Sequence, residues 1–249
     1  MKTEWDYSEL ADAYLERPPY SPDALKKLYS IAGIGSGAVV CDIGAGVAHL
    51  TISLCEAGFE VVAVEPNDAM RANGMKRTSG LKVKWVEAGG EDTGLESGQF
   101  DFVTFGSSFN VMDRNKAMRE THRLLKKNKW FACLWNHRNL DDPIQKAIEA
   151  IIASSIPGYD YGVRRADQTD VIAGSGLFDS VQSVTGELTF PQSVDKTIEA
   201  WRSHATLHRQ AGKKFDAIIE DISRYLNSLG ADSIDIPYTT RAWIARKAD

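Results

Sequence analysis

Short apolar runs alternate with helical segments along the first half of the chain. Five runs have the length and composition of buried strands, and they lie at 38–42, 61–65, 81–86, 100–105 and 130–135. The segments between them are predicted as helices, two of which Asn67 and Asp113 are suited to cap. Strands and helices that alternate in this way predict a parallel sheet with helices on both faces, wound right-handed.

Two helices are expected ahead of this alternating region. Residues 8–16 form the first, and the second runs over 21–33, with Ser21 as its N-cap and proline at its first position. We interpret residues 1–34 as an N-terminal helical lid.

The regular alternation of strands and helices stops after residue 136, where the predicted cofactor-binding core (35–136) ends. Further strands are predicted at 178–190 and 234–245, and helices at 193–210 and 215–229. A strand that returns after so long a helical excursion fits an antiparallel position. We therefore predict one α/β domain over 1–249, a Rossmann-like, doubly wound seven-stranded sheet with an antiparallel last strand. Region 137–249 completes the sheet and carries helical cap insertions at about 141–175 and 193–230.

Composition narrows the possible partners. The chain has 249 residues, 43% of them hydrophobic, and a formal net charge of −5. A mild acidic excess argues against a protein that holds nucleic acid through phosphate contacts. The sequence shows no secretory signal and no apolar run long enough for a membrane helix. We expect a cytoplasmic protein, monomeric or homodimeric, that binds neither nucleic acid nor membrane.

A glycine turn stands between the first predicted strand and the next helix. Gly44 and Gly46 let the backbone approach a ligand closely, and Glu65 closes the second strand, where a carboxylate can accept both hydroxyls of a ribose. The dinucleotide fingerprint would need glycine where His49 stands, and no P-loop occurs. Asp42, just before the turn, would repel a pyrophosphate. A cationic nucleoside without phosphate fits this pattern, which points to S-adenosylmethionine.

With these residues the sequence resembles the class I S-adenosylmethionine-dependent methyltransferases, and is most similar to their small-molecule branch. The matching segments keep the family's order along nearly the whole chain, at 14–21, 42–46, 65–66, 91–101, 135–138 and 236–241. The first resembles the family's Tyr…Arg-Pro-x-Tyr-Pro segment. The sequence departs from the family's pattern at three places, one of which is Lys127-Asn128-Lys129 in place of the usual Pro-Gly-Gly turn. Ala48 replaces the usual third glycine, and Asn110 begins an Asn-Val-Met segment where this branch often has His-Trp-Phe.

The resemblance implies a set of cofactor-binding residues. Gly44 and Gly46 would lie under the methionine part, Glu65 would take the ribose hydroxyls, and Gly90 with Glu91 would edge the adenine. The full implied set is Tyr14, Arg17, Tyr20, Asp42, Gly44, Gly46, Glu65, Pro66, Gly90, Glu91, Gly106 and Ser107. Tyr14, Arg17 and Tyr20 would close over the cofactor, with Arg17 as partner of its carboxylate.

The acceptor side carries weaker signals. Asn110 and His137 are candidate catalytic residues, because both stand beside predicted strand ends. Candidate substrate-binding residues are Tyr159, Tyr161, Arg164, Trp201, His204 and His208. The last two are four residues apart on a predicted helix, but no HExxH pattern is present, and we expect no metal.

The resemblance implies methyl transfer from S-adenosylmethionine to a small metabolite by in-line displacement. O-, N- and carboxylate methylation all fit, since alignment of the nucleophile is the main requirement. The alternatives are a protein or RNA methyltransferase and a non-catalytic S-adenosylmethionine-binding module. The sequence does not identify the acceptor.

Overall fold

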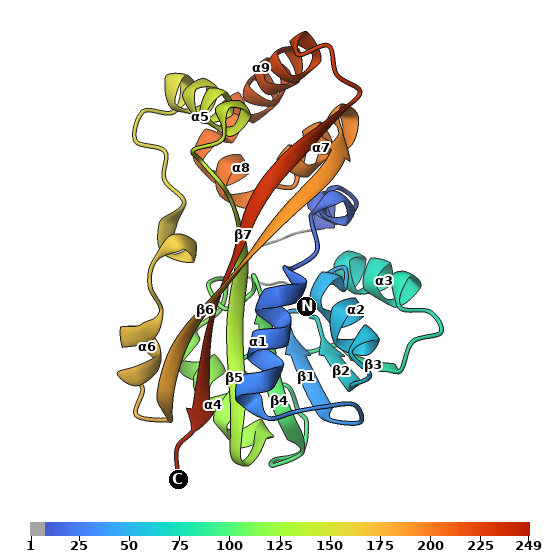
Figure 1. Cartoon of the computed structure of the whole chain (residues 1–249), viewed down its shortest axis with the longest axis vertical. Coiled ribbons are helices and arrows are strands. Elements are labelled where there is room, and N and C mark those ends of the chain that lie inside the picture. Colours follow the sequence, from blue (N-terminus) through green and yellow to red (C-terminus); the bar gives the residue numbers. More distant parts are fainter. Residues whose placement is uncertain (1–7) are drawn as a thin grey trace.

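Seven strands form one mixed sheet within the part of the chain that the structure describes (Figure 1). This computed structural model describes residues 8–249, apart from the side chains of residues 9, 163 and 164. The start of the predicted lid (1–7) and the side chain of Arg164 therefore lie outside the described part. The strands are β1 (Val39–Ile43), β2 (Glu60–Val64), β3 (Val83–Val86), β4 (Phe100–Gly106), β5 (Leu125–Arg138), β6 (Phe178–Ser193) and β7 (Ser233–Lys247).

The strand order is β3-β2-β1-β4-β5-β7-β6. Neighbours among β1 to β5 pair in parallel, whereas β7 lies antiparallel between β5 and β6. The predicted fold class, with its antiparallel last strand, is confirmed. Between β1 and β4 the order reverses direction, and in open α/β sheets such a switch point creates a crevice at the carboxyl ends of the strands.

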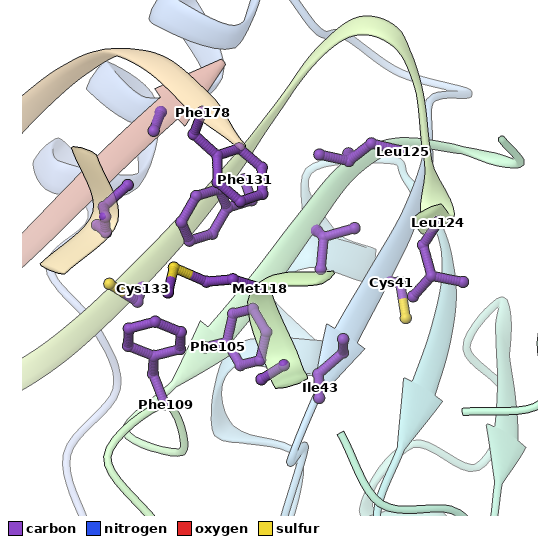
Figure 2. Close-up of a cluster of buried hydrophobic side chains, with 14 of the residues drawn as sticks. Cys41, Ile43, Phe105, Phe109, Met118, Leu124, Leu125, Phe131, Cys133 and Phe178 are labelled. Carbon is purple, nitrogen blue, oxygen red and sulfur yellow. The ribbon is translucent and has the colours of Figure 1, made fainter. Parts of the chain in front are cut away.

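Two hydrophobic clusters cover the two faces of the sheet. On one face, α1 (Pro22–Ala32) and α2 (His49–Glu56) pack through leucines such as Leu28 and Leu54. On the other, α4 (Arg114–Leu124) and α6 (Thr169–Ala173) pack against a cluster of mixed aliphatic and aromatic side chains. Figure 2 shows its labelled members, Phe105, Phe109, Phe131 and Phe178 among them. The doubly wound arrangement therefore follows from apolar side chains on both faces of the strands.

The helix starts behave as their polar residues predict. The Ser21 hydroxyl accepts from the Ala24 amide at the start of α1, and Asn67 Oδ1 accepts from the amide of Met70 at the start of α3 (Asp68–Arg77). Asp113 caps α4 in the same way. All three capping predictions are confirmed.

A helical cap stands beyond the sheet, around the extended ends of β6 and β7 (Figure 1). It consists of α5 (Pro143–Ser155), α7 (Val194–Arg202), α8 (Ala205–Ala211), the 3-10 turn η4 (Gly212–Lys214) and α9 (Phe215–Ser228). These helices share a hydrophobic cluster separate from the two sheet clusters. The predicted apolar face of α9 is buried, except that Leu229 is 37% exposed.

The structure differs from the sequence prediction at three places. Residues 8–16 form two 3-10 turns, η1 (Ser8–Leu10) and η2 (Ala13–Glu16), rather than one helix. The helix predicted over 193–210 is interrupted at Ser203, because the His204 side chain accepts from the Leu207 amide and caps a new helix. Insertion 141–175 is divided, since α5 joins the cap while α6, after the 3-10 turn η3 (Gly162–Arg165), packs against β6. No helix among residues 8–249 is long and apolar enough to cross a membrane.

Candidate active site

A cavity of about 440 Å³ opens at the carboxyl ends of β1, β2 and β4. Its volume falls in the range of about 300–1,000 Å³ that small-molecule sites occupy. The N-terminal segment, the loops after these strands and the cap all contribute to its walls. Every residue that the resemblance implied for the cofactor lines this cavity, as does His204 from the acceptor set.

The glycine turn is held against the start of the loop after β4. Gly44 and Gly46 have φ values of +69° and +56°, a region that glycine adopts without strain. A Cβ on Gly44 would lie 2.4 Å from the Ser108 Cβ, and the Ser108 hydroxyl itself donates to the Ile43 carbonyl (2.5 Å). The backbone in this turn therefore passes too close to its neighbour for any larger residue.

Asp42 is a buried charge beneath the cavity. Its side chain is 1% exposed and accepts hydrogen bonds from the hydroxyls of Thr51 (2.7 Å) and Thr104 (2.9 Å). Burial raises the pKa of Asp42 to about 6, against the lowering effect of the two hydroxyls. The carboxylate thus connects β1 to α2 and β4.

Glu65 joins the two loops that form the cavity floor. Its Oε2 accepts from the Gly46 amide and its Oε1 from the Asn67 amide, each at 2.9 Å. Burial raises its pKa, although both amides and the nearby Arg71 act in the opposite direction. Each carboxylate oxygen can accept more than one hydrogen bond, so Glu65 keeps capacity for ligand hydroxyls.

The N-terminal segment closes one side of the cavity. Arg17 lies over the Tyr14 ring, 3.8 Å from its centroid, and donates from Nε and Nη2 to the hydroxyl and carbonyl of Ser203 (3.0 and 2.7 Å). The Tyr20 and Ser107 hydroxyls are 3.0 Å apart. Arg17 therefore ties the segment to the cap, and its predicted pairing with the cofactor carboxylate stays a prediction.

Gly90 and Glu91, which the resemblance assigns to the adenine, line the cavity after β3, and that assignment stays a prediction. A Cβ on Gly90 would lie 2.6 Å from Ile43 Cγ2 and 2.8 Å from Met112 Sδ. Glu91 Oε1 accepts from the Asp113 amide at 3.0 Å. Contacts with Ile43 and Met112 therefore leave no room for a side chain at position 90, which the sequence motif alone does not reveal.

Arg138 and Tyr238 line the cavity where β5 and β7 extend beyond the sheet. They are cross-strand partners in the antiparallel pair, and neither was among the predicted site residues. Both stand in segments that carried the family resemblance, at 135–138 and 236–241. The missing information was the pairing register, which brings together residues distant in the sequence.

The remaining predicted residues whose side chains the structure describes do not line the cavity. His137 lies between Asn136 and Arg138, which do, and successive strand residues point to opposite faces. Asn110 Oδ1 accepts from the Trp135 indole (2.8 Å).

The other aromatic and histidine candidates pack within the cap. Tyr161 donates to Glu149 and lies edge-on to Tyr159. Trp201 stacks on His204, and His208 contacts the Phe215 ring. The roles predicted for all of these residues, and for Asn110 and His137, stay predictions.

The donors and charges present fit S-adenosylmethionine. The carboxylates of Asp42, Glu65, Glu91 and Asp113 line the cavity, and such a lining suits a ligand with a sulfonium and an ammonium group. Close-packed glycines at the turn allow near approach to the backbone. In the described part of the chain, no cluster of three or more His, Cys, Asp or Glu side chains is placed to hold a metal.

Comparison with known proteins identifies the relatives of this core. The sequence family described as "Methyltransferase domain" matches residues 41–133. An uncharacterized methyltransferase of Mycobacterium tuberculosis is 31% identical over 127 residues, 49% of this chain and 48% of that protein. A ubiquinone/menaquinone biosynthesis C-methyltransferase of Citrobacter koseri is 26% identical over 51% of this chain and 53% of its own length. The chain spans about half the length of these curated relatives.

Solved structures share the fold over most of the chain. A protein of Anaeromyxobacter dehalogenans named as a type II methyltransferase has a TM-score of 0.62 at 18% identity, covering 93% of this chain and 97% of that one. A phosphoethanolamine N-methyltransferase of Haemonchus contortus, with S-adenosylhomocysteine bound, has a TM-score of 0.55 at 16% identity, covering 96% and 56%. At these identities the likeness establishes the fold alone.

The raised pKa of Asp42 predicts a measurable pH dependence of stability. The ordinary pKa of 3.8 rises to about 6 in the folded protein, so folding is penalised above pH 6 and gains stability as the pH falls toward 4. This difference corresponds to about 2 kcal/mol between pH 7.5 and 4.5. We expect wild type to gain that much relative to Asp42→Asn when urea unfolding is measured at both pH values.

An exposed carboxyl group supplies the matched control. Asp235 is exposed on β7, and Asp235→Asn should leave the pH dependence of wild type unchanged. Identical pH dependence in wild type and Asp42→Asn would contradict a raised pKa at Asp42.

Proposed function

We propose that this chain, which belongs to the class I S-adenosylmethionine-dependent methyltransferases, transfers a methyl group from S-adenosylmethionine to a small molecule. The observation that carries the proposal is a single cavity in which one set of residues would hold a cofactor and a different set an acceptor. The glycine turn, Asp42 and Glu65 form a floor suited to the cofactor, and Arg138 and Tyr238 border the part beside the cap. The names of the relatives support the reaction class.

The floor residues would bind the cofactor through complementary charge and hydrogen bonding. When bound, S-adenosylmethionine supplies a methyl group already activated on a sulfonium. Glu65 would accept the ribose hydroxyls, while the Gly46 and Asn67 amides keep its carboxylate in place. The buried Asp42 charge would favour the ammonium group. Gly44 and Gly46 would let the ligand approach the main chain.

The protein's contribution to the reaction would be mainly alignment and exclusion of water. Methyl transfer needs the nucleophile in line with the breaking bond, which a closed and preorganised cavity provides. The Arg17 bonds to Ser203 hold the N-terminal segment against the cap over this cavity. No general base is required for a carboxylate or an unprotonated amine. Asn110 and His137 would then act by orienting other groups, as Asn110 does with Trp135.

A small acceptor fits the enclosure better than a macromolecule. Helices of the cap contribute Ala200 and His204 to the cavity wall, so an RNA base or protein side chain would have to pass the cap. The net charge of −5 also disfavours RNA. Relatives named for C- and N-methylation indicate that this fold does not fix the acceptor atom.

Loss of the Glu65 carboxylate should weaken cofactor binding strongly. We expect wild type to bind S-adenosylhomocysteine with a dissociation constant in the micromolar range, roughly 8 kcal/mol. Glu65→Ala should weaken this at least about a hundredfold, because two ribose hydroxyls lose a charged acceptor. Isothermal titration calorimetry measures both values.

Glu60 provides the control for this titration, because it is an exposed glutamate at the opposite end of the same strand. Glu60→Ala should bind like wild type. Wild-type protein that gives no heat with either S-adenosylmethionine or S-adenosylhomocysteine would contradict the cofactor assignment.

Transfer of a labelled methyl group tests the activity itself. Wild type with methyl-labelled S-adenosylmethionine and a panel of phenols, amines and carboxylic acids should label at least one small molecule, and should label bulk tRNA and denatured protein no more than a protein-free blank. Label that appears on RNA or protein instead would overturn the small-molecule acceptor. Cofactor binding without any transfer would favour the non-catalytic module.

A further inference from the structure

We propose that the methyl acceptor carries an oxyanion, such as a carboxylate, and that Arg138 binds it. The inference rests on the proposed function and concerns the acceptor end of the same cavity. Arg138 lines the cavity, and its guanidinium makes no hydrogen bond or ion pair with any residue that the structure describes. Its Nε is buried and lacks a partner.

A partly buried guanidinium in this state calls for an anionic partner. Arginine stays protonated and presents five N–H donors in a planar fork that matches a carboxylate or phosphate. Buried charge is costly unless it is paired. The ring faces that contact Arg138 attract it without supplying a counter-charge or an acceptor for its donors.

Its neighbours hold the guanidinium in one place. The guanidinium carbon lies 4.1 Å from the Trp201 ring centroid and 5.7 Å from that of Tyr238. Arg165 Nη2 donates to the Arg138 carbonyl (3.2 Å), which fixes the strand end. A side chain held in this way loses little further freedom when it binds a planar ligand.

A second donor belongs to the same place. Tyr238 is the cross-strand partner of Arg138, lines the cavity and is 3% exposed, and its buried hydroxyl has no hydrogen-bond partner in the described structure. A phenol hydroxyl and a guanidinium fork together present donors, and donors select an acceptor such as an oxyanion.

The carboxylates that line the cavity and the Arg138 guanidinium come from different strands of the sheet and the loops that follow them. Asp42 lies near the end of β1, and the other carboxylates that line the cavity follow β2, β3 and β4, whereas Arg138 comes from the extended end of β5. Glu149 is the acidic residue whose charge raises the pKa values of Arg165 and Tyr161, and its carboxylate accepts a hydrogen bond from the Tyr161 hydroxyl. Arg165 lies near the same end of β5: burial lowers its pKa, Tyr161 and Glu149 raise it, and Arg138 lowers it. A cationic cofactor and an anionic acceptor would thus each meet opposite charge.

Calorimetry on protein saturated with S-adenosylhomocysteine tests this assignment. The probes are benzoate against benzamide and phenyl phosphate against phenol. We expect at least one anion to bind about tenfold or more tighter than its neutral counterpart. Arg138→Gln should abolish that preference while the S-adenosylhomocysteine dissociation constant stays within about twofold of wild type. Tighter binding of benzoate or of phenyl phosphate distinguishes the two oxyanions.

Arg119→Gln is the matched control, because Arg119 is exposed on α4. It should keep the wild-type preference for anions. Anions and neutral probes that bind equally to wild type, or an undiminished preference in Arg138→Gln, would overturn the inference while leaving cofactor binding intact. Wild type that fails to bind S-adenosylhomocysteine would instead contradict the proposed function, and the inference with it.

Discussion

The Glu65 carboxylate, held between two backbone amides, is the interaction on which the cavity depends. It fixes the glycine turn after β1 to the loop after β2, because Gly46 donates to one oxygen and Asn67 to the other. The turn can lie there only because Gly44 has no side chain to meet Ser108. A ligand that binds Glu65 therefore enters a preorganised site, and ordering the loops costs little of the binding free energy.

Separation of charge follows from the topology of the sheet. The parallel strands end at one edge of the sheet, where Asp42 and Glu65 lie. Burial raises the pKa of both carboxyl groups. The antiparallel insertion of β7 extends β5 beyond that edge and brings Arg138 beside Tyr238. The fold thus places four carboxylates near the ends of the parallel strands and Arg138 at the extended end of β5, which would suit a cationic cofactor and the proposed anionic acceptor.

Local signals in the sequence predicted the parts of the structure that local physics controls. Apolar runs located the strands, polar caps located the helix starts, and the glycine turn with Glu65 located the cavity floor. The position of Arg138 depends on register between β5 and β7, which pair residues about a hundred positions apart in the chain. The break at Ser203 depends on capping by the His204 side chain, and helical spacing alone does not reveal it.

A crystal structure of the protein with S-adenosylhomocysteine would show whether Glu65 and the glycine turn bind the cofactor. We expect both ribose hydroxyls within hydrogen-bond distance of the Glu65 carboxylate, with the amino acid part of the ligand over Gly44 and Gly46. Electron density for the nucleoside elsewhere in the molecule, or a ribose without contact to Glu65, would contradict this expectation.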